Sequence, residues 1–155
     1  MYRKEAFLKL YEEDSYVFRN KGFFVEDLQL TVLLATIGEI RYLDEPTLAY
    51  SINEKSITGN KDFNKQFDFH FGALMLTRYL ANKTGVSQQK LDEVYKKIIH
   101  FILMQAFHSG DKARMKKIKS LIEEWKVPLL MKTKLIFKLT SNSILWQMAK
   151  IIKGA

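Results

Sequence analysis

Residues 22–58 read GFFVEDLQLTVLLATIGEIRYLDEPTLAYSINEKSIT, and the first part of this stretch has the pattern of a capped helix. The acidic pair Glu26-Asp27 precedes a run of leucine, valine and isoleucine that ends at Gly38. Carboxylates favour the positive end of the helix dipole, and glycine commonly follows a last helical turn. The pattern predicts a helix over residues 26–37.

The second part of the stretch alternates apolar and polar side chains. This period of two predicts short strands over residues 39–43 and 47–52. Pro46 lacks an amide hydrogen and is expected at the break between the two strands. The stretch therefore predicts a small α/β segment.

The chain from Phe63 onward predicts only helices, because its apolar residues recur at spacings of three and four. Gly85 marks a helix end, Ser87 is a helix N-cap, and Pro128 opens a further helix in its first turn. Residues 14–22 predict a loop. Helices are expected over residues 3–13, 26–37, 63–83, 87–108, 112–125, 129–139 and 143–153. The predicted fold is mostly α, with two short strands followed by a bundle of about five helices.

Charge divides the chain at the place where the strands give way to helices. Residues 1–59 hold 7 Lys and Arg against 10 Asp and Glu, whereas residues 60–155 hold 18 against 7. We predict two units, residues 1–59 and a basic helical bundle over 60–155, with the boundary within residues 58–62. The basic half suits an anionic phospholipid surface, nucleic acid or a polyanionic substrate. The alternative is a lysine-rich solvent face on an ordinary bundle.

Composition excludes several classes of function. The sequence has no cysteine, which excludes disulfides, thiolate zinc sites and thiol nucleophiles and suits a reducing compartment. Its first residues mix charge into every turn and lack the apolar core of a signal peptide. The longest apolar run, residues 98–107, is far shorter than the ~20 residues that cross a bilayer. We expect a cytoplasmic protein that can lie at the inner face of a membrane.

A carboxylate fixed at the start of a rigid helix can act as a general base. Asp27 has this position, ahead of the apolar run of the predicted helix. The alternative is that Glu26 and Asp27 only cap the helix, by satisfying its free amides and its dipole.

Short pieces of residues 3–58 also occur in a fixed order. The pieces are Arg3-Lys4-Glu5-Ala6-Phe7, Glu26-Asp27-Leu28-Gln29-Leu30, Gly38-Glu39-Ile40-Arg41-Tyr42-Leu43, Glu45-Pro46-Thr47-Leu48, Tyr50 and Ser56-Ile57-Thr58. In this order and spacing they resemble the acceptor-side part of family-two inverting glycosyltransferases of the GT-A fold. The resemblance covers about sixty residues, and the ordered set is more specific than any single piece.

The resemblance implies a role for each acidic residue. Asp27 would be the base that removes the proton from the acceptor hydroxyl, and Glu26 would be its neighbour in the acceptor site. The two predicted strands would be the remnant of a GT-A sheet. The implied substrates are a nucleotide-sugar and a glycan or lipid-linked acceptor, with a divalent metal, Mn or Mg, in the intact enzyme.

The sequence departs from the family pattern in two ways. Ser51 follows Tyr50 where relatives often have an arginine, and the nucleotide-binding half with its Asp-x-Asp motif has no counterpart. We therefore expect a fragment that is inactive alone and binds no cofactor tightly. Strands 39–43 and 47–52 would expose their edges, which predicts a homo-oligomer of the fragment.

Two other features suggest further roles. His70 is a candidate metal ligand, because a histidine downstream of the acidic pair binds metal in some relatives, although a lone histidine more often packs or faces water. Residues 132–153 alternate lysine with apolar side chains, as in helices that lie on anionic membranes, and packing of that apolar face inside the bundle is the alternative. The lysines of 112–119 could track phosphates, but no nucleic-acid-binding motif is present and we expect no specific nucleic acid. A non-catalytic basic helical module, binding a membrane surface, a partner protein or nucleic acid, is the alternative function.

Overall fold

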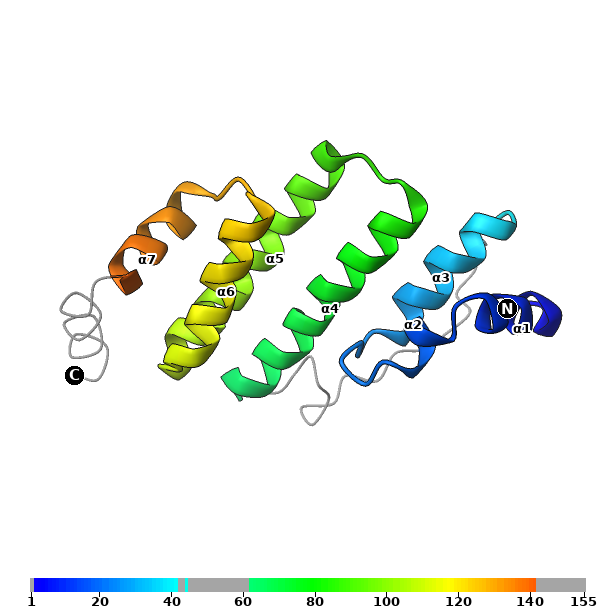
Figure 1. Ribbon diagram of the computed structural model, residues 1–155, viewed down its shortest axis with the longest axis horizontal. Coiled ribbons are helices and arrows are strands. Elements are labelled where there is room, and N and C mark those ends of the chain that lie inside the picture. The colour runs from blue at the N-terminus through cyan, green and yellow to red at the C-terminus, as the bar shows by residue number, and fades with distance from the viewer. Residues whose placement is uncertain (1, 42–43, 45–61, 142–155) are drawn as a thin grey trace.

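The computed structural model describes residues 2–41, 44 and 62–141, and within these ranges the protein is mostly helical (Figure 1). The described helices are α1 (Lys4–Glu13), α2 (Ser15–Arg19), α3 (Glu26–Ile37), α4 (Phe63–Thr84), α5 (Gln88–Ser109), α6 (Lys112–Trp125) and α7 (Met131–Ser141). In this part of the chain, none is long and apolar enough to cross a membrane.

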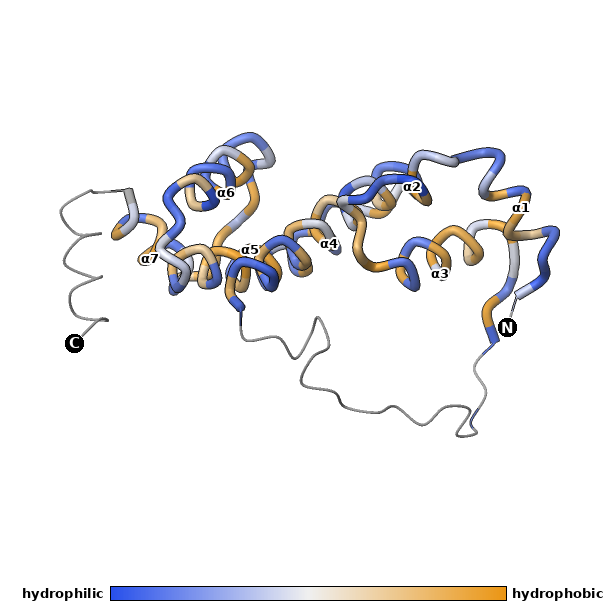
Figure 2. Tube along the Cα trace, turned by 90° about the horizontal axis from the view of Figure 1, so that it is seen from below, coloured by the Kyte–Doolittle hydropathy of each residue, from blue (hydrophilic) through white to orange (hydrophobic). Residues whose placement is uncertain are grey.

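The helices form an elongated array with α1 at one end and α7 at the other (Figure 1). The closest packing is between α4 and α5, and α6 and α7 pack on α5. At the other end α3 packs on α1, α2 and α4. Seen from below, α6 and α2 stand on the same side of α4, which lies between them (Figure 2). One face of α4 is therefore flanked by α2 on one side and by α6 on the other.

Two clusters of buried apolar side chains hold the array together, and α4 contributes to both. The larger one joins α4, α5, α6 and the segment after α6, with Tyr95, Ile99 and Ile118 fully buried. The smaller one joins α1, α2 and α3 to Leu76 and Leu80 of α4. The smaller cluster therefore spans residues from both predicted units, and the boundary within 58–62 stays a prediction.

Most of the predicted helices are confirmed. The helix over 26–37 and the helix over 112–125 have the predicted bounds. Gly85 and Gly110 end their helices in the left-handed conformation, with φ of 68° and 71°. Ser87 precedes α5 as predicted, but it caps through its carbonyl, which accepts hydrogen bonds from the amides of Lys90 and Leu91.

The predicted strands are not seen in the described residues. Residues 39–41 form no strand. Residues 42–43 and all of 47–52 lie outside the described part. The predicted helix over 143–153 also lies outside it. The mostly α character is confirmed, and the small α/β segment stays a prediction.

Two local predictions are wrong. Residues 14–22 were expected to form a loop, but Ser15–Arg19 form α2, because the Asp14 carboxylate accepts a hydrogen bond from the Val17 amide and caps a short turn. Pro128 was expected in a first helical turn, but α7 begins at Met131. Val127 is buried in the larger cluster, so the segment around Pro128 serves as a packed connection before the helix.

Candidate functional site

Glu26 and Asp27 occupy the first turn of α3, and both side chains are exposed. The N-cap residue is Val25, which makes no side-chain cap hydrogen bond. Within the described residues, neither carboxylate has a hydrogen bond or an ion pair. The capping alternative therefore reduces to a favourable interaction with the helix dipole, worth about 0.3–1 kcal/mol at an exposed site. Both carboxylates are available to accept a proton from a ligand.

The loop that leads into α3 is fixed by an unusually close contact with α4. A Cβ added to Gly72 would lie 2.2 Å from the carbonyl oxygen of Gly22 and 2.9 Å from Cδ2 of Phe24. Gly72 is itself buried. Only glycine allows the loop to approach the helix this closely, so α4 determines where α3, and with it Asp27, begins.

A second contact fixes the junction of α1 and α2 against α4. The Asp14 carboxylate is buried and accepts hydrogen bonds from the Tyr79 hydroxyl at 2.7 Å and the Lys83 ammonium at 2.6 Å. Burial alone would raise the pKa of Asp14, but the bonds from Lys83 and Tyr79 favour the carboxylate and lower its pKa below the ordinary value. Burial and the Asp14 charge raise the pKa of Tyr79 to about 12. This network holds α2 beside α4 at neutral pH.

A groove runs along α4 on the face between α2 and α6. One cavity of about 530 Å³ lies toward α2, and a second of about 520 Å³ lies toward α6. The cavities share Phe71, Met75 and Lys117 in their linings, so they lie next to each other along α4, and the two together are called the groove. The α4 residues that line it are Asp68, Phe71, Gly72, Met75, Arg78, Tyr79 and Asn82, a single stripe at helical spacing about 21 Å long.

The wall of the groove on the α2 side is the same loop that precedes Asp27. Asn20, Gly22, Phe23 and Phe24 line the groove, and Phe24 is 48% exposed. Its ring is therefore open to a ligand in the groove, three residues before Asp27. The groove and the acidic pair are consequently connected through one short segment.

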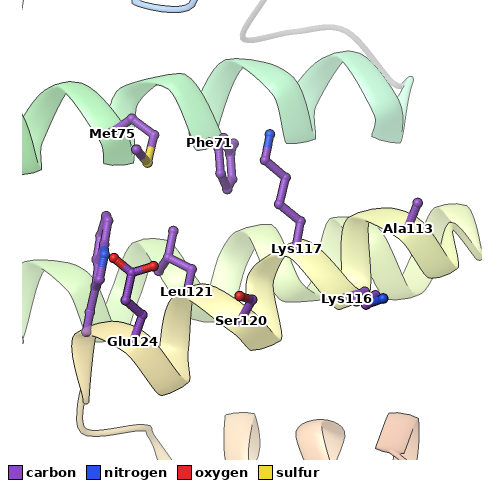
Figure 3. A pocket seen from close by; sticks show the side chains of 9 residues that line it. Phe71, Met75, Ala113, Lys116, Lys117, Ser120, Leu121 and Glu124 are labelled. Carbon is purple, nitrogen blue, oxygen red and sulfur yellow. The ribbon is translucent and has the colours of Figure 1, made fainter.

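The wall on the α6 side is bridged to α4 by cationic side chains. Arg114 pairs with Asp68 at 2.9 Å, Lys117 lies 4.0 Å from the centre of the Phe71 ring, and Arg78 of α4 lies 4.8 Å from that of Trp125. Figure 3 shows Phe71 and Met75 reaching from α4 toward α6, while Lys117 reaches from α6 toward α4. Aromatic faces, a guanidinium, an ammonium and amides thus meet in one groove, a mixture typical of ligand sites.

A third cavity gathers residues from three of the sequence pieces quoted above, with Leu30 as the member from the second piece. It has a volume of about 760 Å³ and lies between α1 and the end of α3. Its lining includes Arg3 and Ala6 from the first piece and Gly38 to Arg41 from the third. Segments more than thirty residues apart in the sequence therefore lie side by side.

His70, the candidate metal ligand, packs against aromatic rings, and its metal role stays a prediction. This residue lies on α4, with its ring 4.4 Å from that of Phe101 and 5.1 Å from that of Phe69. Burial lowers the pKa of His70, because it penalises the charged imidazolium. Among the described residues, no three His, Cys, Asp or Glu side chains gather to hold a metal ion, and no described contact joins His70 to the acidic pair.

Sequence reasoning missed the groove, the Gly72 contact and the Asp14 network. One signal was present for Gly72, because an isolated glycine inside a helical pattern costs about 1 kcal/mol against alanine and can have a packing reason. Asp14 gave no signal, since its partners Tyr79 and Lys83 are 65 and 69 residues away.

Comparison of the chain with protein-family models, with curated proteins and with solved structures found no match.

Proposed function

We propose that this chain forms the acceptor side of an inverting glycosyltransferase, with Asp27 as the general base and Glu26 beside it in the acceptor site. The observation that carries the proposal is the state of Asp27, an exposed carboxylate without a described partner, on a helix whose start is fixed by the Gly72 contact. A base works best on a rigid element, in reach of the proton it removes.

The groove along α4 is where we place the acceptor. Phe24, Phe71 and Trp125 offer aromatic surfaces, while Arg78 and Asn82 offer polar groups that can orient hydroxyls. An acceptor in this groove would contact Phe24 and extend toward the start of α3. The acceptor is a glycan or a lipid-linked sugar, and the donor is a nucleotide-sugar.

The proposed role of this chain is limited to positioning the acceptor and removing its proton. The resemblance implies a divalent metal, Mn or Mg, that assists departure of the nucleotide. The described residues offer no donor set for such an ion, and His70 packs against aromatic rings. We therefore assign the metal and the donor to a separate nucleotide-binding half and expect this chain to be inactive alone.

The experiment begins with the gene. An open reading frame that continues upstream of the Met1 codon and encodes an Asp-x-Asp after a strand would supply the intact enzyme. In that enzyme, Asp27→Asn should lower the rate of sugar transfer about 10²- to 10⁴-fold, the usual contribution of a general base. Glu26→Gln should have a smaller effect, and Glu12→Gln, an exposed carboxylate on α1, should have none.

Two outcomes would contradict the proposal. One is an intact enzyme in which Asp27→Asn transfers sugar at the wild-type rate. The other is a gene that starts at Met1 with no upstream frame for a donor-binding half.

The alternative is a non-catalytic basic helical module that binds a membrane surface, a partner protein or nucleic acid. It predicts that Asp27→Asn changes only stability, by less than about 1 kcal/mol through the helix dipole. Sedimentation of the purified chain would test the proposed homo-oligomer, and a single monomeric species at all concentrations would contradict it.

A further inference from the structure

The helix α7 has an inner face that is packed and an outer face that is not. Thr133 is buried, and Ile136 and Phe137 pack against the larger cluster. On the outer face, the side chains of Met131 and Leu135 are 87% and 61% exposed. Large apolar side chains this open, one helical turn apart, make a small hydrophobic ridge on the surface.

Lysines border this ridge on both sides. At 3.6 residues per turn, Lys134 and Lys138 lie on one side of Met131 and Leu135, and Lys132 lies on the other. All three lysines are exposed, and none has an ion pair within the described residues. The helix α7 contains no acidic residue to neutralise them.

The inner face holds α7 firmly in place. Nδ1 of His100 lies 2.9 Å from the Thr133 hydroxyl, and the Lys119 ammonium lies 5.5 Å from the centre of the Phe137 ring. The helix sits at the end of the array opposite α1, with no other described helix beyond it (Figure 1). Its outer face is thus presented by a rigid support at the edge of the described part of the chain.

We propose that the outer face of α7 docks on an anionic phospholipid surface. An apolar ridge with lysines on both sides matches the two layers of such a surface, because the ridge enters the acyl boundary while the ammonium groups meet the phosphates. Nucleic acid would use the lysines but leave Met131 and Leu135 in water. The inference concerns location and does not depend on the proposed sugar transfer.

The test is cosedimentation of the whole chain with vesicles of phosphatidylcholine, with and without 30% phosphatidylserine. Binding should need the anionic lipid and should weaken as salt is raised, because exposed charges are screened. Replacing Lys132, Lys134 and Lys138 with glutamine should weaken the partition coefficient about a hundredfold, at roughly fivefold for each lysine. Leu135→Gln should weaken it about tenfold through the lost apolar contact.

Matched variants separate this face from charge in general. Glutamine at the exposed Lys90, Lys97 and Lys112 gives the same net charge as the α7 triple variant and should leave binding near the wild-type level. Val94→Gln, at an apolar position 42% exposed on α5, is the control for Leu135→Gln. Circular dichroism of each variant verifies that the helices are retained.

Three outcomes would overturn the proposal. The first is absence of binding to the anionic vesicles. The second is an equal loss of vesicle binding in both triple variants, which would show that binding depends on net charge and not on the position of the lysines. The third is binding to a DNA duplex that depends on the α7 lysines, together with vesicle binding that is unchanged by Leu135→Gln.

Discussion

The substitution Gly72→Ala tests the contact on which the position of Asp27 depends. The new Cβ would meet the Gly22 carbonyl oxygen at 2.2 Å, and a backbone atom cannot rotate away as a side chain can. Overpacking of this kind costs about 1–3 kcal/mol. Because the atom that must move belongs to the backbone, the upper part of this range applies, about 2–3 kcal/mol. Alanine regains roughly 1 kcal/mol of helix propensity, so the net loss in the free energy of unfolding should be about 1–2 kcal/mol.

Urea unfolding followed by circular dichroism measures this loss, and trypsin cleavage after Lys21 reports where it occurs. Lys21 is exposed in the loop that the new methyl group would push away from α4, so cleavage there should be faster in Gly72→Ala. The thermal midpoint should fall by about 2–8 °C for a chain of this size.

The matched control is Gly38→Ala. A Cβ at Gly38 meets only the Leu34 carbonyl oxygen at 3.8 Å, an ordinary contact, and the backbone there is extended. This variant should stay within about 0.5 kcal/mol of wild type. If Gly72→Ala proves as stable as Gly38→Ala, or more stable than wild type, the close approach of loop and helix does not exist and the reasoning fails.

Two further predictions concern the other contacts that fix α4. Asp14→Asn should lower the free energy of unfolding by about 2 kcal/mol at neutral pH. This figure is smaller than that for a fully buried ion pair, because Lys83 is partly exposed and solvent weakens its attraction to Asp14. Because the pKa of Asp14 is lowered from 3.8 on folding, its contribution is complete above that value and is lost as the pH falls through the folded pKa. The difference in urea midpoint between wild type and Asp14→Asn should therefore be constant from pH 7 to pH 5 and should disappear below about pH 4. A difference that persists in acid would contradict the role of the ionised Asp14 carboxylate. Arg114→Met keeps the apolar stem but loses the pairs with Asp68 and Asp111 and should cost about 1 kcal/mol, whereas Lys112→Met should cost nothing measurable.

The sequence predicts the helices well where the apolar pattern is long and its ends are marked. The helix over 112–125 has Met115, Ile118, Leu121 and Ile122 at a regular spacing, and Asp111 caps it through two backbone amides. The apolar spacing and the cap are both local signals, so a single sequence is enough to predict this helix. The five residues of α2 are too few to show a period, so the pattern of residues 14–22 predicts a loop instead of this helix.

The candidate site is less predictable, because it depends on contacts between distant segments. The exposed position of Asp27 follows from the pattern, since a carboxylate in a first turn rarely faces the core. The groove follows from nothing local, because it needs α2 and α6 on the same side of α4. The surroundings of His70 are likewise not local, because its ring packs on Phe101 of another helix, and its metal role stays a prediction.

The arrangement around α4 suggests how to separate chemistry from positioning at Asp27. One helix contacts the loop before α3 through Gly72 and the α1–α2 junction through Asp14. Asp27→Asn removes the proposed base and disturbs no described contact, so in the intact enzyme it should lower the rate of transfer while stability falls by less than about 1 kcal/mol through the helix dipole. Gly72→Ala leaves the base in place and moves the loop, so it should lower both together. The contrary result is a transfer rate of Gly72→Ala that falls only in proportion to the fraction of unfolded enzyme. That result would mean that catalysis does not need the start of α3 to be held in place, and the groove and the acidic pair would then be independent features.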